Sequence, residues 1–452
     1  MKKILILAYD FPPYISVGGL RPHYWYEHFK EMGIYPIVVT RNWNPIHGNA
    51  LDYIQPSHTN EVVIEETDKG TLIKAPYKAT LSNRLNLKGK NGKFFNILKK
   101  ISTGWNEIGQ WFLPIGTKYE LYKVANTYLK ENKADIILAT GEPFVLFRYA
   151  SKLSKEFDIP WIADYRDPWS NNSLRSKTKL SFWFNKRNEQ KALANVTHIS
   201  TVSDFFKKKI ELILGEKPIS IFPNGYNEDA FTKIEPIPQN NKILTISLAG
   251  TLYDWHPYKL FLETVDIYLQ KNTSKQLKIE FFGINKANEI KHIIEQSTCL
   301  KDTVFIYPRM ANQQLLTKMA ESNVLLLFND YSILGTKIYD CLALNRKIIL
   351  CFEEDKEATK LKEQYYNVSA IAGLSERLQA DLIQETKSGI VVKNTVRLEQ
   401  VLDELFSEFQ QNGMIESHTV GTENYSRKLQ TERLVEVLKG TFVNPQDKFS
   451  SK

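Results

Sequence analysis

The segment NDYSILGTKIYD, residues 329–340, combines phosphate-binding and sugar-binding groups within one predicted helical turn. It follows the apolar run NVLLLF, so Gly335 and Thr336 are expected at a helix N-terminus, where free backbone N–H groups bind phosphate. Lys337 adds a positive charge that suits a diphosphate. Asp340, three positions later and on the same helical face, can accept both hydroxyls of a ribose. This pattern predicts a nucleotide-diphosphate site, and the alternative is a Lys–Asp pair that only supports the helix.

A glycine pair, Gly18 and Gly19, stands between the first apolar run, KILILA, and a helical pattern. Glycine has no side chain and can adopt positive φ, so a ligand or another backbone segment can approach closely. A helix that begins here would direct free N–H groups and the positive end of its dipole at an anion such as phosphate. A strand–turn–helix without a ligand accounts for the pair equally well. Arg21 and His23 follow and are candidate acceptor-binding residues.

Two further loops that follow predicted strands carry side chains suited to a sugar. GEPF follows the run DIILAT, and YRDPW follows PWIAD. Carboxylates accept hydrogen bonds from hydroxyls, and an indole covers the apolar face of a sugar ring. For the second loop, the alternative is an Arg–Asp pair that only orders the chain. The expected acceptor-site residues in these loops are Glu142, Asp164, Arg166, Asp167 and Trp169. Asp167 is also the predicted catalytic carboxylate, with Lys337 as the catalytic cation.

The second half of the chain has a similar loop after its first predicted strand, ILTISLA. In the sequence LAGTLYDWHP, Gly250 and Thr251 follow this strand and are predicted to contribute to the donor site. A lone histidine such as His256 is more often structural than a ligand. The predicted donor site therefore joins two loops of the second half with the glycine pair of the first.

The composition is that of a globular protein in a reducing compartment. The chain has 452 residues, of which 42% are hydrophobic and 24% charged, as expected for two or three domains. It has no run of about 18 apolar residues, and its first apolar run is too short for a signal peptide. The three cysteines form no close metal-type pair and suggest no disulfide framework. We expect a cytoplasmic protein without a metal site or cofactor.

Positive charge, +8 overall, is concentrated at residues 84–100, RLNLKGKNGKFFNILKK. This segment has six Lys or Arg residues, no acid, and several apolar residues. Such a segment can lie on an anionic membrane, here the inner face of the cytoplasmic membrane. A solvated loop whose apolar residues pack back on the domain fits as well. No nucleic-acid-binding motif accompanies the charge, so a nucleic-acid partner is not expected.

Short β-rich runs alternate with helical patterns, which predicts parallel sheets built from βαβ units. The expected strands are 3–8, 35–40, 62–66, 72–75, 135–140, 160–164, 198–203, 219–223, 243–249, 277–282, 304–308, 323–328, 347–352 and 389–392. They predict an α/β fold with two doubly wound Rossmann-like domains, whose ligands bind beyond the carboxyl ends of the strands. The expected parts are an N-terminal domain at 1–231 with a returning helix at 424–440, a linker at 232–241, a second domain at 242–420, and a flexible tail at 441–452.

From end to end, the chain resembles the family-4-like glycosyltransferases of the GT-B fold. The resembling segments are PPYISVGGLRPHYWYEHFKEMGIYPIVVT, GEPF, WIADYRDPW, STVSDFF, PNGYNEDAF, LAGTLYDWHP, LLTKMAESNVLLLF and GTKIYDCLALNRKIIL. The resemblance implies two domains facing across a cleft, the first binding the acceptor and the second the nucleotide sugar. It also implies a C-terminal helix that crosses back to the first domain. The implied reaction is a retaining, metal-independent transfer.

Carried over by position, the resemblance places Gly18 and Gly19 beside the donor diphosphate and gives Lys337 the task of holding it. Asp340 stands where these enzymes keep a glutamate for the ribose. The chain departs from the family at three places.

Ser332 replaces the first of the usual two glutamates, and Thr251 stands where an arginine is common. The lysine expected near Trp255 and His256 is absent. The residues left to supply positive charge at the diphosphate are Lys337, Arg21 and His256.

We therefore expect a hexosyltransferase-type enzyme that moves a sugar from a nucleotide diphosphate sugar to an acceptor hydroxyl. The YRDPW loop resembles that of relatives that act in surface polysaccharide assembly. The acceptor is expected to be a glycan or lipid-linked glycan of polysaccharide, capsule or lipopolysaccharide synthesis. Two alternatives stay open: a sugar-nucleotide epimerase on the same scaffold, and a non-catalytic homologue that binds sugar nucleotides.

Overall fold

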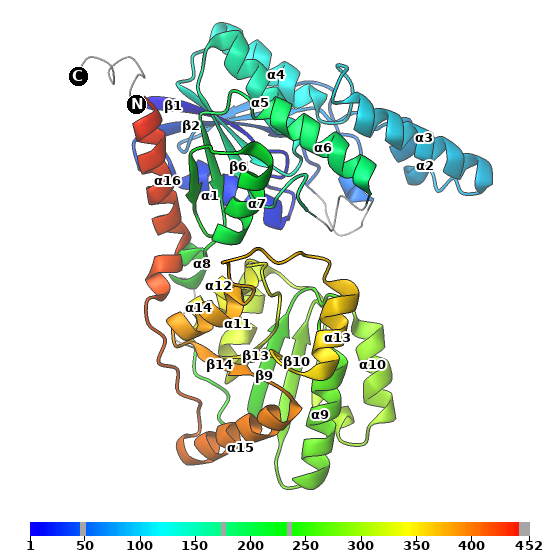
Figure 1. Cartoon of the computed structure of the whole chain (residues 1–452), viewed down its shortest axis with the longest axis vertical. Helices are drawn as coiled ribbons and strands as arrows, with labels where there is room; N and C mark the ends of the chain where they lie inside the picture. Colours follow the sequence, from blue (N-terminus) through cyan, green and yellow to red (C-terminus); the bar gives the residue numbers. More distant parts are fainter. Residues whose placement is uncertain (46–50, 173–177, 233–236, 443–452) are drawn as a thin grey trace. The chain divides into compact units, whose positions relative to one another are not determined.

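The computed structural model describes residues 1–45, 51–172, 178–232 and 237–442, which divide into two compact units (Figure 1). The first unit comprises Met1–Pro223 and the segment from Gln430 onward. The second unit comprises Asn224–Leu429. Each unit has its own sheet, covered by helices on both faces.

The sheet of the first unit has eight strands in the order β3-β4-β2-β1-β5-β6-β7-β8. Neighbouring strands are parallel except for β3, which pairs antiparallel with β4. The strands are β1 (Lys2–Leu7), β2 (Ile34–Arg41), β3 (Val63–Glu66), β4 (Thr71–Ala75), β5 (Ile136–Gly141), β6 (Trp161–Tyr165), β7 (His198–Thr201) and β8 (Ile219–Ile221).

The sheet of the second unit has six parallel strands in the order β11-β10-β9-β12-β13-β14. These strands are β9 (Leu244–Ala249), β10 (Leu277–Phe282), β11 (Val304–Tyr307), β12 (Val324–Phe328), β13 (Lys347–Cys351) and β14 (Gly389–Val392). The two sheets confirm the predicted α/β fold with two doubly wound Rossmann-like domains.

Helices connect the strands in both units. Those of the first unit are α1 (Leu20–His28), α2 (Leu81–Leu87), α3 (Lys93–Gly109), α4 (Tyr119–Glu131), α5 (Val145–Phe157), α6 (Lys179–Ala192) and α7 (Asp204–Leu214). Those of the second are α8 (Glu228–Thr232), α9 (Tyr258–Lys271), α10 (Ala287–Gln296), α11 (Asn312–Glu321), α12 (Lys337–Leu344), α13 (Lys356–Tyr365), α14 (Leu378–Glu385) and α15 (Thr395–Asn412). The last helix, α16 (Arg427–Phe442), begins in the second unit and continues in the first. Within the described ranges, no helix combines the length and the apolar character needed to cross a bilayer.

The alternation of side chains along β1 explains why its sheet needs helices on both faces. Leu5 and Leu7 belong to one apolar cluster, whereas Ile4 and Ile6 belong to another on the opposite face. All four residues are fully buried. A strand buried on both faces has the near-continuous apolar sequence that identified it.

Helix α16 completes the apolar layer on one face of the first sheet. Its residues Leu434, Val435 and Leu438 are buried in the same cluster as Trp25 and Phe29 from the region of α1. The C-terminal part of the chain therefore belongs to the core of the first unit.

The first unit ends at Pro223, before the expected domain boundary at residue 231. The chain beyond Pro223 packs with the second unit, because Tyr226 and Phe231 lie against an apolar cluster of that unit. In the expected linker 232–241, residues 233–236 lie outside the described residues. Asn240 is hydrogen-bonded to Thr245 of β9, at 3.1 Å. Residues 443–452 of the expected tail also lie outside the described part of the chain.

Candidate functional site

Both sheets reverse their strand order at a point where ligands of doubly wound folds bind. The reversal falls between β1 and β5 in the first sheet and between β9 and β12 in the second. The predicted site loops follow these strands and β6, which is the neighbour of β5. Each unit therefore gathers its candidate residues at the carboxyl ends of adjacent parallel strands.

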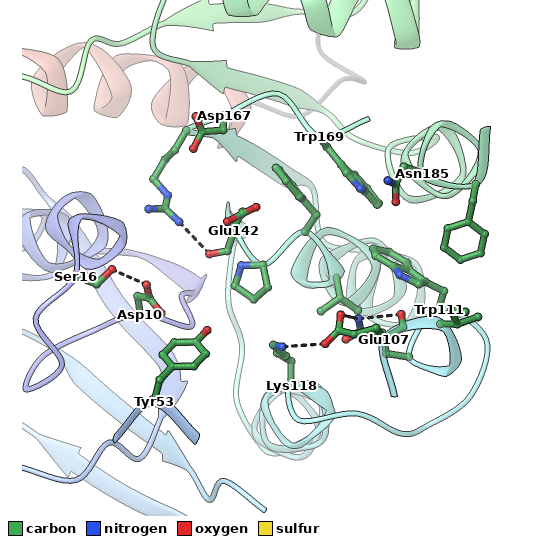
Figure 2. Close-up of a pocket in the computed structure, with 17 residues that line it drawn as sticks. Asp10, Ser16, Tyr53, Glu107, Trp111, Lys118, Glu142, Asp167, Trp169 and Asn185 are labelled. Carbon is green, nitrogen blue, oxygen red and sulfur yellow. Dashed lines mark hydrogen bonds and ion pairs between the residues drawn. The ribbon is translucent and has the colours of Figure 1, made fainter. Parts of the chain in front are cut away.

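The first unit has a pocket of about 600 Å³ at this edge of its sheet (Figure 2). The predicted acceptor residues Glu142, Arg166, Asp167 and Trp169 all line it. Figure 2 shows the acidic side chains of Glu142 and Asp167 on one side and the indole of Trp169 on the other. The structure thus brings together four side chains that the sequence assigned to the acceptor.

Asp167 has no hydrogen-bond or ion-pair partner among the described residues. Burial raises the pKa of its carboxyl group, an effect that the nearby guanidinium of Arg166 partly offsets. A carboxylate in this state can accept a hydrogen bond, and then a proton, from a bound hydroxyl group.

Arg166 is held against the loop that follows β5. Its Nε donates to the carbonyl oxygen of Gly141 at 3.0 Å, and its Nη2 donates to that of Glu142 at 2.9 Å. A Cβ atom on Gly18 would lie 2.5 Å from Arg166 Nη1 and 2.8 Å from Asp10 Oδ2. Gly18 therefore makes room for these two side chains.

Neither Gly18 nor Gly19 has a positive φ, so the space beside them, and not backbone conformation, limits a side chain here. The N–H group of Gly18 donates to Ser16 Oγ, and that of Gly19 donates to the carbonyl oxygen of Ser16. The N–H of Leu20 donates to the carbonyl oxygen of Val17. These amides are hydrogen-bonded within the chain, so they are not available to a ligand. The predicted donor role of the glycine pair stays a prediction.

The predicted acceptor residues Arg21 and Asp164 form a buried ion pair, with Arg21 Nη2 at 2.8 Å from Asp164 Oδ1. They are 5% and 0% exposed and do not line the pocket. Asp164 also accepts hydrogen bonds from Thr140 at 2.9 Å and from Ser200 at 2.8 Å. The pair links α1 to strands β5, β6 and β7 and leaves Asp164 no surface for an acceptor.

His23, another predicted acceptor residue, lies on α1 outside the pocket. Its Nε2 is 3.4 Å from Glu27 Oε1, one helical turn away. The structure therefore separates Arg21, Asp164 and His23 from Glu142, Arg166, Asp167 and Trp169.

The indole of Trp169 is only 4% exposed. It stacks on Trp111 with ring centroids 4.9 Å apart and on Phe144 with centroids 5.2 Å apart. Neighbouring rings thus cover much of Trp169, and the half-buried Trp111 offers more indole surface to a sugar.

Several pocket residues were not among the predicted site residues. They include Asp10, Ser16, Tyr53, Glu107, Trp111 and Lys118. Asp10 follows β1 at the strand-order reversal, so its position in the sequence could have identified it. Its carboxylate accepts a 2.6 Å hydrogen bond from Ser16, and burial raises its pKa. Tyr53 and Lys118 come from connections without a recognisable motif.

In the second unit, the predicted donor residues meet at the start of α12. Lys337 Nζ donates to the carbonyl oxygen of Thr251 at 2.6 Å. Gly250 has φ of +89°, and a Cβ on it would lie 2.8 Å from Lys337 Cε. The loops after β9 and β12 are thus in contact through the lysine, and Gly250 is required there by both conformation and space.

The first amides of α12 are free for a ligand. Among the described residues, the N–H groups from Gly335 to Ile338 donate to no protein acceptor. No atom outside its own chain neighbours lies within 4 Å of a Cβ built on Gly335, so the space beside it is open. Thr336 precedes the helix as its N-cap but makes no capping hydrogen bond through its side chain. In contrast to the Gly18–Gly19 turn, this N-terminus offers unoccupied donors to a phosphate.

Asp340 lies one turn into α12 and has no hydrogen-bond partner in the described ranges. Burial raises the pKa of its carboxyl group to about 6, although the positive charge of Arg427 opposes the shift. Partial burial therefore disfavours the ionised form of Asp340, and no group in the described part of the chain donates a hydrogen bond to it. Such a carboxylate is suited to accept hydrogen bonds from a ligand.

We expect Asp340→Asn to stabilise the free protein above about pH 6 while weakening its nucleotide binding. The folded-state pKa exceeds the ordinary value, so ionisation of Asp340 costs stability as pH rises from about 4 to 6, and the full cost persists above that range. The gain should be on the order of 2 kcal/mol near pH 8 and smaller near pH 5. Denaturant unfolding of both chains at the two pH values would measure it. An equal gain at both pH values would contradict this origin.

Ser332 and His256 both have hydrogen-bond partners within the second unit. Ser332 is 2% exposed and its Oγ is hydrogen-bonded to the hydroxyl of Tyr366 at 2.8 Å. His256 Nδ1 accepts from the N–H of Tyr253 at 3.2 Å, and Nε2 contacts Asp330 Oδ1 at 2.9 Å. Of the three expected cations, Arg21 and His256 each contact a carboxylate, whereas Lys337 donates to a neutral carbonyl oxygen, that of Thr251.

No protein-family model matches this chain, and no curated protein sequence matches it. Solved structures match it along nearly its whole length. A sucrose-phosphate synthase from Thermosynechococcus elongatus is 12% identical, with a TM-score of 0.58 over 98% of this chain and 99% of that chain. An alpha,alpha-trehalose-phosphate synthase (UDP-forming) from Burkholderia vietnamiensis is 9% identical, with a TM-score of 0.57 over 97% and 100%. HepE from Anabaena, solved in complex with UDP, is 9% identical, with a TM-score of 0.55 over 97% and 100%. These likenesses show that the chain has the GT-B fold.

Proposed function

We propose that this chain is a glycosyltransferase that transfers a sugar from a nucleotide diphosphate sugar to an acceptor hydroxyl. The second unit binds the nucleotide sugar, and the pocket of the first unit binds the acceptor. Assignment to the family-4-like group, with retention at the anomeric carbon and no metal or cofactor, is part of the proposal. Two structurally similar proteins support this choice of donor: one from E. coli is bound with UDP-2-fluoro glucose, and HepE from Anabaena is in complex with UDP.

One observation carries the proposal: the start of α12 combines free amides, a lysine and a half-buried carboxylate within one helical turn. The amides and Lys337 fit a diphosphate, and Asp340 fits the two hydroxyls of a ribose. Gly335 leaves open space for a ligand to approach the backbone, and Gly250 makes room for the Lys337 side chain. These groups recognise the part that all nucleotide diphosphate sugars share.

The same groups support the chemistry of sugar transfer. As the bond from the anomeric carbon to the diphosphate breaks, negative charge develops on the leaving phosphate. Preorganised N–H dipoles at α12 and the ammonium group of Lys337 stabilise that charge without a metal ion. In the first unit, Asp167 accepts the hydrogen bond of the attacking hydroxyl and orients it.

Thermal unfolding with a panel of nucleosides, nucleoside monophosphates and nucleoside diphosphates tests the donor site. We expect one nucleoside diphosphate to raise the melting temperature, its monophosphate to do so less, and its nucleoside least, because the α12 contacts are to phosphates. Nucleotide sugars with the same base should then be assayed for transfer. A chain that no nucleotide stabilises would contradict the proposal.

Replacing Lys337 by alanine is expected to weaken binding of that nucleoside diphosphate by about 10- to 100-fold. The loss follows from removal of a charge-assisted hydrogen bond, worth roughly 1.5–3 kcal/mol. Calorimetric titration would measure it, with Lys337→Arg expected to retain more affinity. Lys271→Ala, on an exposed lysine of α9 in the same unit, is the matched control. Equal affinities of Lys337→Ala and the control would contradict the assignment of Lys337.

A non-catalytic protein that binds nucleotide sugars is the second candidate. The observation in its favour is Ser332, which stands at a position where the resembling enzymes keep a glutamate and is buried against Tyr366. The two candidates differ in one measurement, because both bind the donor but only a glycosyltransferase releases nucleoside diphosphate from it. Donor binding without release, under all acceptor conditions, would favour the second candidate.

The proposed acceptor is a glycan or lipid-linked glycan, as in the synthesis of polysaccharide, capsule or lipopolysaccharide. Carboxylates and indoles line the pocket, which fits a ligand with both hydroxyl groups and apolar ring faces. Peripheral attachment to an anionic membrane through residues 84–100 is part of the proposal, because this segment is basic and has no acid.

A further inference from the structure

Helix α3 carries a row of exposed apolar side chains along its whole length. Phe94, Ile97, Ile101, Trp105 and Ile108 are between 57% and 68% exposed. Their spacing of three and four residues places them on one face of the helix. An apolar row of five residues on one helix is a sign of an interaction surface, whereas scattered single residues are not.

A different face of α3 makes the contacts that hold the helix in the first unit. Ser102 Oγ accepts a hydrogen bond from the N–H of Ser82 in α2 at 3.1 Å, and Thr103 Oγ1 donates to Ser82 Oγ at 2.9 Å. Figure 1 shows α2 and α3 together at the edge of the first unit, beyond its sheet. The exposed row is therefore not needed to fix α3 in place.

The exposed surface continues onto α6. Phe112, just after α3, is 61% exposed, and its ring centroid is 6.2 Å from that of Phe184 in α6. On α6, Leu180 and Trp183 are 76% and 56% exposed. The guanidinium of Arg187 lies over the Trp183 ring, 5.6 Å from its centroid. Two helices thus contribute to one apolar surface with positive charge on it.

Positive charge also borders the row on α3. Lys93 lies four residues before Ile97, and Lys100 lies three residues after it, so both are neighbours of Ile97 on the helix surface. The α2–α3 segment from residue 84 to 100 has six basic residues and no acid. Aromatic and aliphatic side chains flanked by lysines complement anionic lipid, whose headgroups attract the lysines while its acyl region takes up the apolar side chains.

We propose that the α3–α6 surface, defined by Phe94, Ile97, Ile101, Trp105, Leu180 and Trp183, docks on an anionic lipid bilayer. Helix α3 then lies in the plane of the interface, with its apolar row among the acyl chains. The docking face extends beyond the basic segment 84–100, because most of its apolar residues lie C-terminal to that segment or on α6.

The pocket shares its wall with this surface. Ile108 near the end of α3, Trp111 just after α3, and Phe184 of α6 line it. We infer that an acceptor with a lipid anchor reaches the pocket while its anchor stays in the membrane. This step alone rests on the proposed function. The docking itself does not depend on that step.

Sedimentation of the full chain with vesicles tests the docking. Wild type is expected to bind vesicles of phosphatidylcholine mixed with phosphatidylglycerol, and to bind phosphatidylcholine alone at least about tenfold more weakly. Replacing Ile97, Ile101 and Trp105 together by serine should reduce binding to the anionic vesicles by about tenfold or more. The matched control is Leu212→Ser with Val396→Ser, at exposed apolar positions on α7 and α15. It should bind the vesicles like wild type.

Three results would overturn the docking: no binding of wild type to anionic vesicles, equal binding by the triple variant, or a dimer of wild type that the triple variant does not form. The last would show that a second copy covers the surface. Thermal shift with nucleoside diphosphates separates this outcome from failure of the proposed function. The triple variant should respond to nucleotides like wild type, because its substitutions lie in the first unit and the donor groups in the second.

Discussion

Asp167→Asn is expected to lower the transfer rate by about 10²- to 10³-fold while leaving donor binding unchanged. Loss of a side chain that takes up a proton in the transition state has an effect of this order. Asp167 lines the pocket of the first unit without a partner among the described residues, so the substitution breaks no hydrogen bond that these residues make. Release of nucleoside diphosphate in the presence of acceptor would measure the rate, and calorimetry would measure donor binding.

The pH dependence of the rate distinguishes a catalytic Asp167 from a merely structural one. Only its ionised form accepts a proton, so the wild-type rate should rise with pH through the pKa of Asp167. Burial raises this pKa above the usual range of an aspartate, and this acid limb should be absent in Asp167→Asn. The matched control is Asp158→Asn. Asp158 is exposed and has a left-handed backbone conformation, which asparagine also tolerates. A normal rate in Asp167→Asn would remove Asp167 from the mechanism.

Asp164→Ala is expected to destabilise the first unit by about 3–5 kcal/mol, because it leaves the guanidinium of Arg21 buried without its partner. Two hydroxyl groups that donate to Asp164, those of Thr140 and Ser200, also lose their acceptor. Amide hydrogen exchange of the full chain would show the loss in peptides of the first unit and not in those of the second.

Removing both charges gives the comparison that identifies the cause. The double variant Arg21→Met with Asp164→Leu should lose less stability than Asp164→Ala, since no unpaired charge is then buried. If the amide hydrogens of Asp164→Ala exchange at the wild-type rates, the ion pair does not stabilise the first unit. Substrate binding should follow the stability of each variant, because neither residue lines the pocket.

The strands were predictable because both sheets are buried on both faces. Continuous apolar runs such as KILILA and NVLLLF, bounded by polar or turn-forming residues, are typical of buried parallel strands in an α/β chain. The structure confirms a strand within each of the predicted runs, with ends that differ by one or two residues in most cases. The last helix was also predictable, although only the structure shows that Leu434 and Leu438 enter the core of the first unit.

The direction of individual side chains was harder to predict. Asp164 was expected at the end of its strand, but β6 continues to Tyr165 and keeps Asp164 inside the sheet, where Arg21 reaches it. Asp167 lies beyond the strand and does reach the pocket. One additional residue of strand thus separates a buried ion pair from a carboxylate that lines the pocket, and residue spacing alone does not reveal such a difference.

No sequence pattern indicated the pocket residues that come from distant segments of the chain. Tyr53 and Lys118 enter the pocket from segments that carry no motif. The exposed apolar row of α3 also extends beyond the basic segment 84–100, to Ile108. Both features depend on which segments of the fold lie next to one another, and not on local patterns.

The path of α16 has a consequence for synthesis of the protein on the ribosome. The first sheet is translated early, but Leu434, Val435 and Leu438, which cover one of its faces, follow the entire second unit. At roughly 5–20 residues per second, translation of the roughly 200 intervening residues takes about 10–40 seconds. During that time the nascent first domain carries an uncovered apolar face, to which chaperones or other nascent chains can bind. The helix that completes the first unit therefore leaves the ribosome only after the whole second unit has been translated.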